Sequence, residues 1–162
     1  MRIIITGTPG TGKSLIAQAL GKRLKYRIVN DREFCSKKKI GKKDPATKEL
    51  IVPIRRFAEE MNRLLKREKN IIAEGHLLCE AKLKANLIFV LRTAPDILEK
   101  RLSERKYSEA KIQDNVMCEG IDYCKSHALK NYGKEKIIDI INEKSPKIAL
   151  GKIIKAVKQH NK

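Results

Sequence analysis

The sequence predicts an α/β fold in which a parallel sheet of five strands carries helices on both faces. Short blocks of β-branched residues alternate with longer stretches whose apolar residues recur at helical spacing. One block, residues 86–91 (NLIFVL), is apolar throughout, as expected of a central strand covered on both sides. A length of 162 residues suits a single domain, 1–162, and no repeat or low-complexity linker divides it.

The expected strands are the short apolar blocks of the chain: 2–6 (RIIIT), 26–29, 70–73, 86–91 and 136–141 (KIIDII). A stretch long enough for a helix separates most neighbouring strands. Parallel strands joined in this way require right-handed crossovers, which place helices on both faces of the sheet. The pattern therefore predicts a three-layer domain.

The helices are expected between and after these strands. Residues 14–24 repeat apolar side chains at helical spacing, and a longer helix is expected from about 108 to 131. Pro53 and Pro95 suit the first turn of two further helices, where a backbone N–H has no partner to lose. Ser145, followed by a proline, is expected to cap the last helix.

Charge and cysteine usage restrict the setting of the protein. The 37 Lys and Arg against 19 Asp and Glu give a net charge of +18. This surplus indicates attraction to polyanions such as nucleotides or RNA, or a surface that uses lysine for solubility, and both interpretations stay open. The four cysteines form no CxxC pair, so reduced thiols in the cytoplasm are expected. No signal segment or membrane span is expected.

A phosphate-binding loop is the strongest functional signal. Residues 7–14 (GTPGTGKS) match G-x-x-x-x-G-K-[ST] and lie between an expected strand and an expected helix. The glycines let the backbone bend so that its N–H groups surround phosphate oxygens. Lys13 then reaches the β- and γ-phosphates, and the Ser14 hydroxyl ligates Mg²⁺. ATP with Mg²⁺ is therefore expected, and no other cofactor.

Two residues at the end of another strand are candidates for the reaction itself. Glu74 can hold a water bound to the metal or polarise an attacking group, and His76 lies on the same side of an extended chain. The alternative is that Glu74 pairs with a lysine and His76 packs at the strand end.

Arginines near the transfer point are expected because phosphoryl transfer builds negative charge on the equatorial oxygens. Arg92, Arg101 and Arg105 are the candidates. Arg92 is favoured because ligands bind at the carboxyl ends of strands in open α/β sheets. A surface ion pair is the alternative for each of them.

Several segments together resemble the adenylate kinase isoenzyme 6 family, whose archaeal and eukaryotic members are nucleotide kinases linked to maturation of the small ribosomal subunit. The resemblance covers nearly the whole chain. The matching segments are the loop at 7–14, EGH at 74–76, FVLRT at 89–93, EKRLSERKY at 99–107, and Asp114-Asn115 followed by Cys118-Glu119.

The resemblance implies a sheet order of 2-3-1-4-5, an acceptor-nucleotide region at about 30–53 and a short lid at about 104–114. Arg105 in the lid is expected to reach the phosphates, Lys144 the nucleotide base, and His76 is implicated in ATP hydrolysis. The residues expected to hold the triphosphate are Gly10, Gly12, Lys13, Ser14 and Leu15.

Three positions depart from the family pattern. Glu74 stands where the family commonly has Asp. The acceptor region has no arginine at the position of the family's G-D-L-x-R, and Lys37–Lys39 are expected to substitute, without the bidentate grip of arginine. Lys106 replaces a glycine that usually follows the lid arginine.

Two functions are consistent with these features. The first is transfer of the terminal phosphoryl group of ATP to AMP or a related nucleoside monophosphate by a monomeric enzyme. The second is an ATP-hydrolysing ribosome assembly factor with vestigial kinase activity, which binds a small-subunit ribosomal protein near rRNA. The surplus of positive charge, especially at Lys37–Lys43, favours it slightly. A kinase for another small acceptor, such as shikimate or a nucleoside, is a third alternative.

Overall fold

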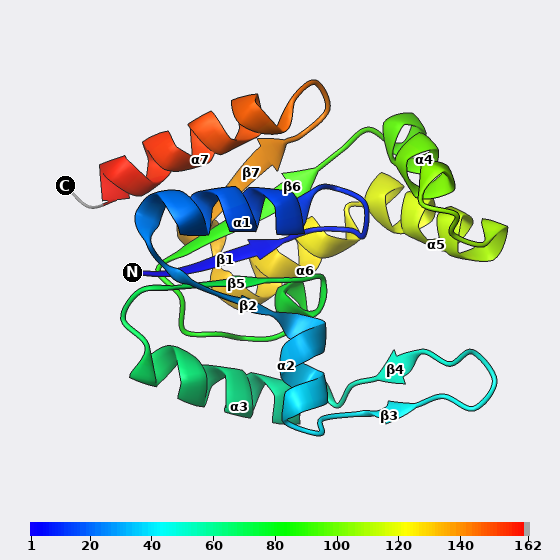
Figure 1. Cartoon of the computed structure of the whole chain (residues 1–162), viewed down its shortest axis with the longest axis horizontal. Coiled ribbons are helices and arrows are strands. Elements are labelled where there is room, and N and C mark those ends of the chain that lie inside the picture. Colours follow the sequence, from blue (N-terminus) through cyan, green and yellow to red (C-terminus); the bar gives the residue numbers. More distant parts are fainter. Residues whose placement is uncertain (161–162) are drawn as a thin grey trace.

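The computed structural model describes residues 1–160, which form three layers around a five-stranded parallel sheet (Figure 1). From edge to edge the strands are β2 (Arg27–Asn30), β5 (Ile71–Glu74), β1 (Arg2–Thr6), β6 (Leu87–Arg92) and β7 (Ile137–Ile141). All four pairings are parallel. Counted along the chain within this sheet alone, the order is 2-3-1-4-5. The predicted fold class is confirmed.

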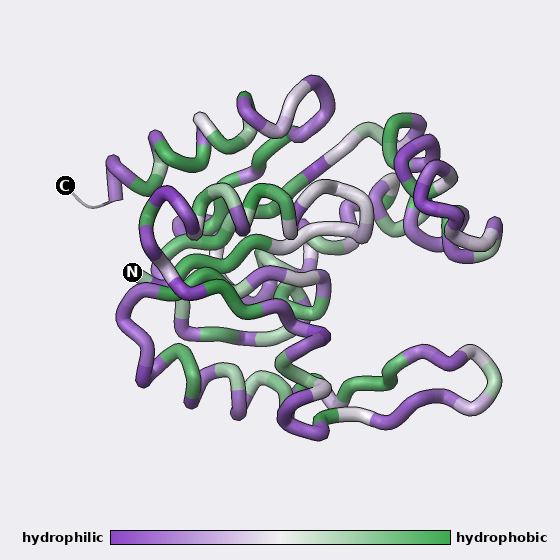
Figure 2. Tube along the Cα trace, in the orientation of Figure 1, coloured by the Kyte–Doolittle hydropathy of each residue, from purple (hydrophilic) through white to green (hydrophobic). Residues whose placement is uncertain are grey.

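Helices cover both faces of the sheet. The helices α1 (Lys13–Leu24) and α7 (Pro146–His160) pack on the face to which Ile3 and Ile5 of β1 point. The opposite face, with Ile4, is covered by α3 (Ile54–Arg67) and α6 (Tyr123–Tyr132). This alternation follows from the two-residue period of a strand. Figure 2 shows the hydrophobic residues gathered along the central strands.

The five predicted strands are present, each within one residue of its expected bounds. The single long helix expected at 108–131 is wrong, because the chain forms α5 (Glu109–Gly120) and then α6. The break lies at Asp122, which adopts a left-handed backbone with φ 56°. Its carboxylate pairs with Arg92 at the end of β6, so the turn brings two successive helices onto that strand.

The segment at 30–53, which breaks the alternation, contains a helix and a hairpin. Helix α2 (Asp31–Lys37) starts after Asn30, whose side-chain oxygen accepts the Glu33 N–H at 3.1 Å. The strands β3 (Lys42–Lys43) and β4 (Leu50–Ile51) then pair antiparallel. In Figure 1 this hairpin projects beyond the sheet, on the same side of the molecule as α4 (Pro95–Glu104) and α5.

Short elements complete the chain. The 3-10 turns η1 (Leu77–Cys79) and η2 (Lys134–Lys136) follow β5 and precede β7. The Ser145 hydroxyl accepts the Lys147 N–H at 3.2 Å, which confirms the predicted cap of α7. Within residues 1–160, no helix combines the length and the apolar content that crossing a bilayer requires.

We expect Phe57→Ala to lower the free energy of unfolding by about 3–5 kcal/mol, because the ring is fully buried and its removal leaves a cavity. The ring also makes an edge-to-face contact with Phe34, with centroids 6.1 Å apart. Urea titration measures the change. Arg55→Ala on the same helix is the matched control, since its side chain is 95% exposed, and should stay within about 0.5 kcal/mol. Equal losses in the two variants would contradict this packing.

Candidate active site

A cavity of about 630 Å³ lies at the carboxyl ends of β1, β2 and β5. Five segments line it: the loop after β1, the region at 30–53, residues 74–80, the stretch from the end of α4 into α5, and the start of α6. Parallel strands end at one edge of a sheet, where open α/β folds place their ligands. The predicted residues on its wall are Gly10, Gly12, Lys13, Ser14, Leu15, Glu74, His76 and Arg105.

The loop after β1 has the shape that phosphate binding requires. Gly12 has φ 94°, and a Cβ there would lie 2.5 Å from the side-chain nitrogen of Asn142. That nitrogen donates to the Thr11 carbonyl at 2.8 Å, so a residue after β7 holds the loop in place. Helix α1 begins directly after Gly12, and its first N–H groups have no carbonyl partner within the helix. Such a helix start is an anion site.

Lys13 lies inside this loop. Its ammonium donates to the Thr8 carbonyl at 2.9 Å, and the residue is only 9% exposed. Burial lowers the pKa of Lys13, while the charges of Asp31 and Glu74 act in the opposite direction. A nearby anion would stabilise the charged form further, so the loop is prepared for a polyphosphate.

Glu74 and Ser14 face each other across the floor of the cavity. The register of the sheet pairs Asn30 and Glu74 on neighbouring strands, and the Asn30 amide donates to the carboxylate at 2.6 Å. The Ser14 hydroxyl lies 3.1 Å from both carboxylate oxygens. Glu74 is 4% exposed, so these hydrogen bonds offset the cost of burying it.

Hydroxyl and carboxylate oxygens are the ligands that Mg²⁺ prefers, so the donor set fits this ion. No group of three or more His, Cys, Asp or Glu able to hold a metal occurs among residues 1–160. Ser14 and Glu74 would therefore share a Mg²⁺ with phosphate oxygens and water, as is usual for this ion.

Asp31 is a second buried carboxylate of the cavity that sequence reasoning missed. It is 1% exposed and accepts the Leu77 N–H at 2.8 Å. Its approach requires glycine at position 75, because a Cβ there would lie 1.9 Å from the Asp31 carboxyl carbon. Burial raises the pKa of Asp31, and the Leu77 N–H and the Lys13 charge oppose this. Its place two residues after the strand expected at 26–29 was the available signal.

His76 lies beside Asp31. Its Nδ1 is 4.0 Å from Asp31 Oδ2. Burial lowers the pKa of His76 to about 4, and the charges of Lys13 and Arg32 lower it as well. The imidazole is therefore neutral near pH 7 and retains a nitrogen that can accept a proton.

Residues of the two regions at 104–114 and 30–53 also contribute to the cavity wall. Arg105 lies at the end of α4, and Lys106 beside it has φ 57°, a backbone that favours glycine. The family glycine at this position therefore has a conformational reason. Lys111 of α5 pairs with Glu49 of the hairpin segment at 3.1 Å, so the two regions meet.

Lys37–Lys39, which were expected to replace the missing arginine of the acceptor region, do not lie on the cavity wall. None of the three lines it, and Lys38 pairs instead with Glu60 at 3.3 Å. Arg32, one residue into α2, is the cation that this segment brings to the cavity wall. It escaped notice because it does not lie at the family's arginine position.

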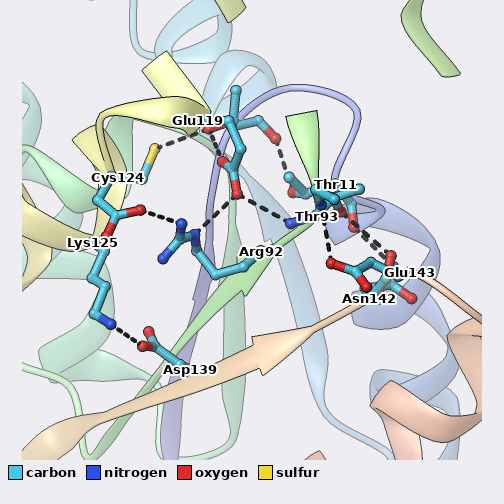
Figure 3. Close-up of polar contacts among 12 residues, drawn as sticks. Thr11, Arg92, Thr93, Glu119, Cys124, Lys125, Asp139, Asn142 and Glu143 are labelled. Atoms are coloured by element: carbon cyan, nitrogen blue, oxygen red, sulfur yellow. Dashed lines mark hydrogen bonds and ion pairs between the residues drawn. The ribbon is translucent and has the colours of Figure 1, made fainter. Parts of the chain in front are cut away.

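Three further residues that the sequence offered as site candidates do not line the cavity. Lys144 is exposed in the loop between β7 and α7. Arg92 is held by two acidic residues: its Nε donates to Glu119 at 2.9 Å, and it also pairs with Asp122 (Figure 3). Arg101 donates to the carbonyls of Asn142 and Glu143. The ion-pair alternative therefore describes Arg92 as the structure places it.

Glu119 connects the phosphate loop to the end of β6. One carboxylate oxygen accepts the Thr8 hydroxyl at 2.5 Å, and the other accepts Arg92 and the Thr93 N–H, the latter at 3.0 Å. Glu119 is 3% exposed. The sequence indicated Glu119 only as part of the Cys118-Glu119 match to the family and gave it no role, because its hydrogen-bond partners lie far away in the chain.

Comparisons with known proteins give the family. The family model described as an AAA domain matches residues 3–122. A protein of Thermococcus kodakarensis named "Putative adenylate kinase" is 34% identical over 98% of this chain and 86% of its own length. A protein of Methanocaldococcus jannaschii with the same name is 33% identical, with the same coverage of both chains. The chain belongs to this adenylate kinase family.

Solved structures agree with the fold of the family. The shikimate kinase of Aquifex aeolicus superimposes with a TM-score of 0.63 at 18% identity, covering 99% of this chain and 98% of its own. The deoxyadenosine kinase of M. mycoides with bound dATP gives 0.62 at 16% identity, covering 98% and 100%. At these identities the likeness establishes the fold.

We expect Glu119→Ala to lower the free energy of unfolding by about 2–4 kcal/mol, since it leaves the Arg92 guanidinium with one acidic partner and the buried Thr8 hydroxyl with only the Cys124 sulfur at 3.9 Å. Asp122→Asn is the matched control: this side chain is 47% exposed, so its pair with Arg92 should contribute less than about 1 kcal/mol. Urea titrations of both variants test the difference. Equal decreases in the free energy of unfolding for the two variants would contradict the larger contribution expected of the buried Glu119 contacts.

We expect the His76 imidazole to titrate near pH 4 in the folded protein, followed by NMR and assigned with His76→Gln. Because this pKa lies below the ordinary value of 6.5, the unfolded chain binds more protons between these two values. The contribution of His76 therefore lowers stability as the pH falls from about 6.5 to 4, and His76→Gln should lack it. A midpoint near 6.5 would contradict the burial of this ring.

Proposed function

We propose that the protein transfers the terminal phosphoryl group of Mg-ATP to AMP or a related nucleoside monophosphate. One observation carries the proposal: the phosphate loop, with Lys13, faces a cavity whose opposite wall comes from the region at 30–53. A phosphate site with a second binding surface beside it suits transfer between two bound substrates. The names of the curated relatives support the same class of reaction.

In this mechanism the first amides of α1 and the Lys13 ammonium bind the β- and γ-phosphates. Ser14 and Glu74 would hold Mg²⁺, and the ion would supply positive charge beside the phosphate oxygens. Arg105 approaches from the lid at 104–114, and Arg32 from the acceptor region at 30–53 faces the monophosphate. Closure of the lid on the acceptor region excludes water from the transfer.

The alternative is an ATP-hydrolysing assembly factor of the isoenzyme 6 type. Two observations favour it. Neutral His76 beside Asp31 can take a proton from an attacking water. Four exposed lysines of the region at 30–53 are available for RNA phosphates: Lys37, Lys39, Lys42 and Lys43. Its partner would be a small-subunit ribosomal protein near rRNA. In either case we propose a cytoplasmic monomer.

An acceptor panel separates the two functions. Purified protein is incubated with Mg-ATP alone, with each nucleoside monophosphate, and with small ribosomal subunit components. For a kinase we expect ADP formation with AMP or another monophosphate to exceed ATP loss without acceptor by about 100-fold or more. Hydrolysis that no monophosphate accelerates but ribosomal components do would overturn the kinase proposal.

Two variants run in the same panel locate the chemistry. Lys13→Ala should lower every activity about 100-fold or more, because it removes charge stabilisation from the phosphates. Lys22→Ala, at an exposed position of the same helix, is its control. His76→Gln should lower hydrolysis more than ATP affinity, and an unchanged hydrolysis rate removes this residue from the mechanism.

A further inference from the structure

The edge of the sheet that lies opposite the active-site cavity is formed by the amino ends of the strands. Helix α1 leads from the carboxyl end of β1 to β2, and α7 starts after the carboxyl end of β7, so both helices end at this amino edge. Helix α3 leads into β5 and ends there as well. Figure 1 shows the ends of these helices on the side where the N-terminus is marked. Several elements therefore contribute to a second surface, away from the phosphate loop.

A second cavity, of about 570 Å³, opens at the amino edge. Its basic residues come from the start of β1, the end of α3, the turn after α3 and the end of α7: Arg2, Lys66, Lys69 and His160. Asn86 fixes the backbone of Arg2, since its side-chain oxygen accepts the Arg2 N–H and its own N–H donates to the Arg2 carbonyl, both at 2.8 Å. Glu68 is the acidic residue on the wall, and Arg27 pairs with it. The lining of this cavity therefore keeps a surplus of positive charge.

Helix α7 extends this positive charge along one face of the molecule. Its four lysines are all exposed: Lys147, Lys152, Lys155 and Lys158. At about 100° of rotation per residue they fall within an arc of about 140°, opposite the buried Ala149, Ile153 and Val157. Neither α7 nor α1, which packs beside it, contains an acidic residue. None of the ion pairs between described residues involves these four lysines.

The two signs of charge are separated in space. Helices α4 and α5, beside the active-site cavity, each carry three acidic residues and together only three basic ones. Helix α3 carries both signs and joins them in ion pairs, such as that between Arg55 and Glu59 at 3.3 Å. A surface that serves solubility alone would intersperse the two signs. The cations gathered at the amino edge therefore indicate a surface for a polyanion.

The composition of α1 and α7 indicates which polyanion fits. A membrane surface requires exposed apolar side chains among the cations, and single-stranded bases stack on aromatic rings. The exposed Leu15 and Ile148 lie in the first turns of α1 and α7, at the ends away from the amino edge. Neither helix contains Phe, Tyr or Trp. Cations without apolar or aromatic neighbours suit the phosphates of a duplex, whose bases are stacked inside.

We propose that a basic edge, formed by Arg2, Lys66, Lys69, Lys155 and Lys158, binds the phosphate backbone of a nucleic-acid duplex. These side chains neutralise phosphates and release the counterions bound to them, which supplies the free energy of binding. The basic edge and the phosphate loop lie at opposite edges of the sheet, so a duplex and Mg-ATP can be bound together. The proposal does not depend on the proposed kinase activity.

The test measures binding of a labelled RNA duplex of about 20 base pairs to the full chain by fluorescence anisotropy, beside a DNA duplex of the same length. With about four phosphates neutralised, we expect the Kd to rise about 100-fold between about 50 and 200 mM salt. Saturating Mg-ATP should leave the Kd unchanged. Binding of either duplex supports the proposal, and the comparison of the two tells whether ribose hydroxyls contribute.

Lys155→Glu combined with Lys158→Glu should weaken duplex binding about tenfold or more. Its ATP affinity should equal that of the unmodified chain, which also shows that the variant is folded. Lys48→Glu combined with Lys100→Glu is the matched control, because it makes the same change in charge at exposed positions away from the amino edge. This control should lose less than about threefold.

Lys155→Gln combined with Lys158→Gln keeps the test valid if the reversed charges destabilise α7. The slope of log Kd against log salt should then fall by about 1.8, the amount expected for two lost phosphate contacts. The absence of duplex binding at about 50 mM salt, equal losses in the edge and control variants, or displacement of the duplex by Mg-ATP would each overturn the proposal. Tighter binding to phosphatidylserine vesicles than to either duplex would also overturn it, by assigning the surface to a membrane.

Discussion

The register of the parallel sheet places the chemistry of this protein. It pairs Asn30 with Glu74 on adjacent strands, and both strands end at the edge of the sheet where α1 begins. Ser14 lies two positions after Gly12, the residue that caps this helix. A carboxylate buried to 4% exposure is costly unless hydrogen bonds satisfy it, and Asn30 and Ser14 supply these bonds. A slip of β5 by one residue would turn Glu74 to the other face of the sheet and leave the floor of the cavity without its acid.

Much of the architecture was predictable because each strand carries its own signal. The blocks at 2–6 and 86–91 are apolar enough to identify central strands without knowledge of their neighbours. The errors arose where structure depends on contacts across the fold. The periodicity of residues 108–131 predicts one helix, but a turn at Asp122 interrupts it. This turn is accompanied by an ion pair with Arg92, which is distant in the sequence. The hairpin strands of two residues each are too short to form a pattern.

The residues of the candidate site also fall into those that the sequence predicted and those that depend on distant contacts. Lys13 and Ser14 were predictable because the loop that orients them is contiguous in sequence. Asp31 and Glu119 were not, because their partners lie 46 and 111 residues away, at Leu77 and Thr8. Arg92 and Arg105 look alike in the sequence, and only their surroundings separate them: the first is bound between two carboxylates, whereas the second remains on the cavity wall.

The ion pair between Glu49 and Lys111 joins the hairpin to α5, and about half of each side chain is exposed. Pairs this well hydrated contribute about 0–1 kcal/mol, an amount comparable to thermal energy. The pair therefore adds little stability to the contact between the hairpin and α5. Dissolved salt screens two charges that are this exposed, so the contact between these two regions weakens as the ionic strength of the medium rises.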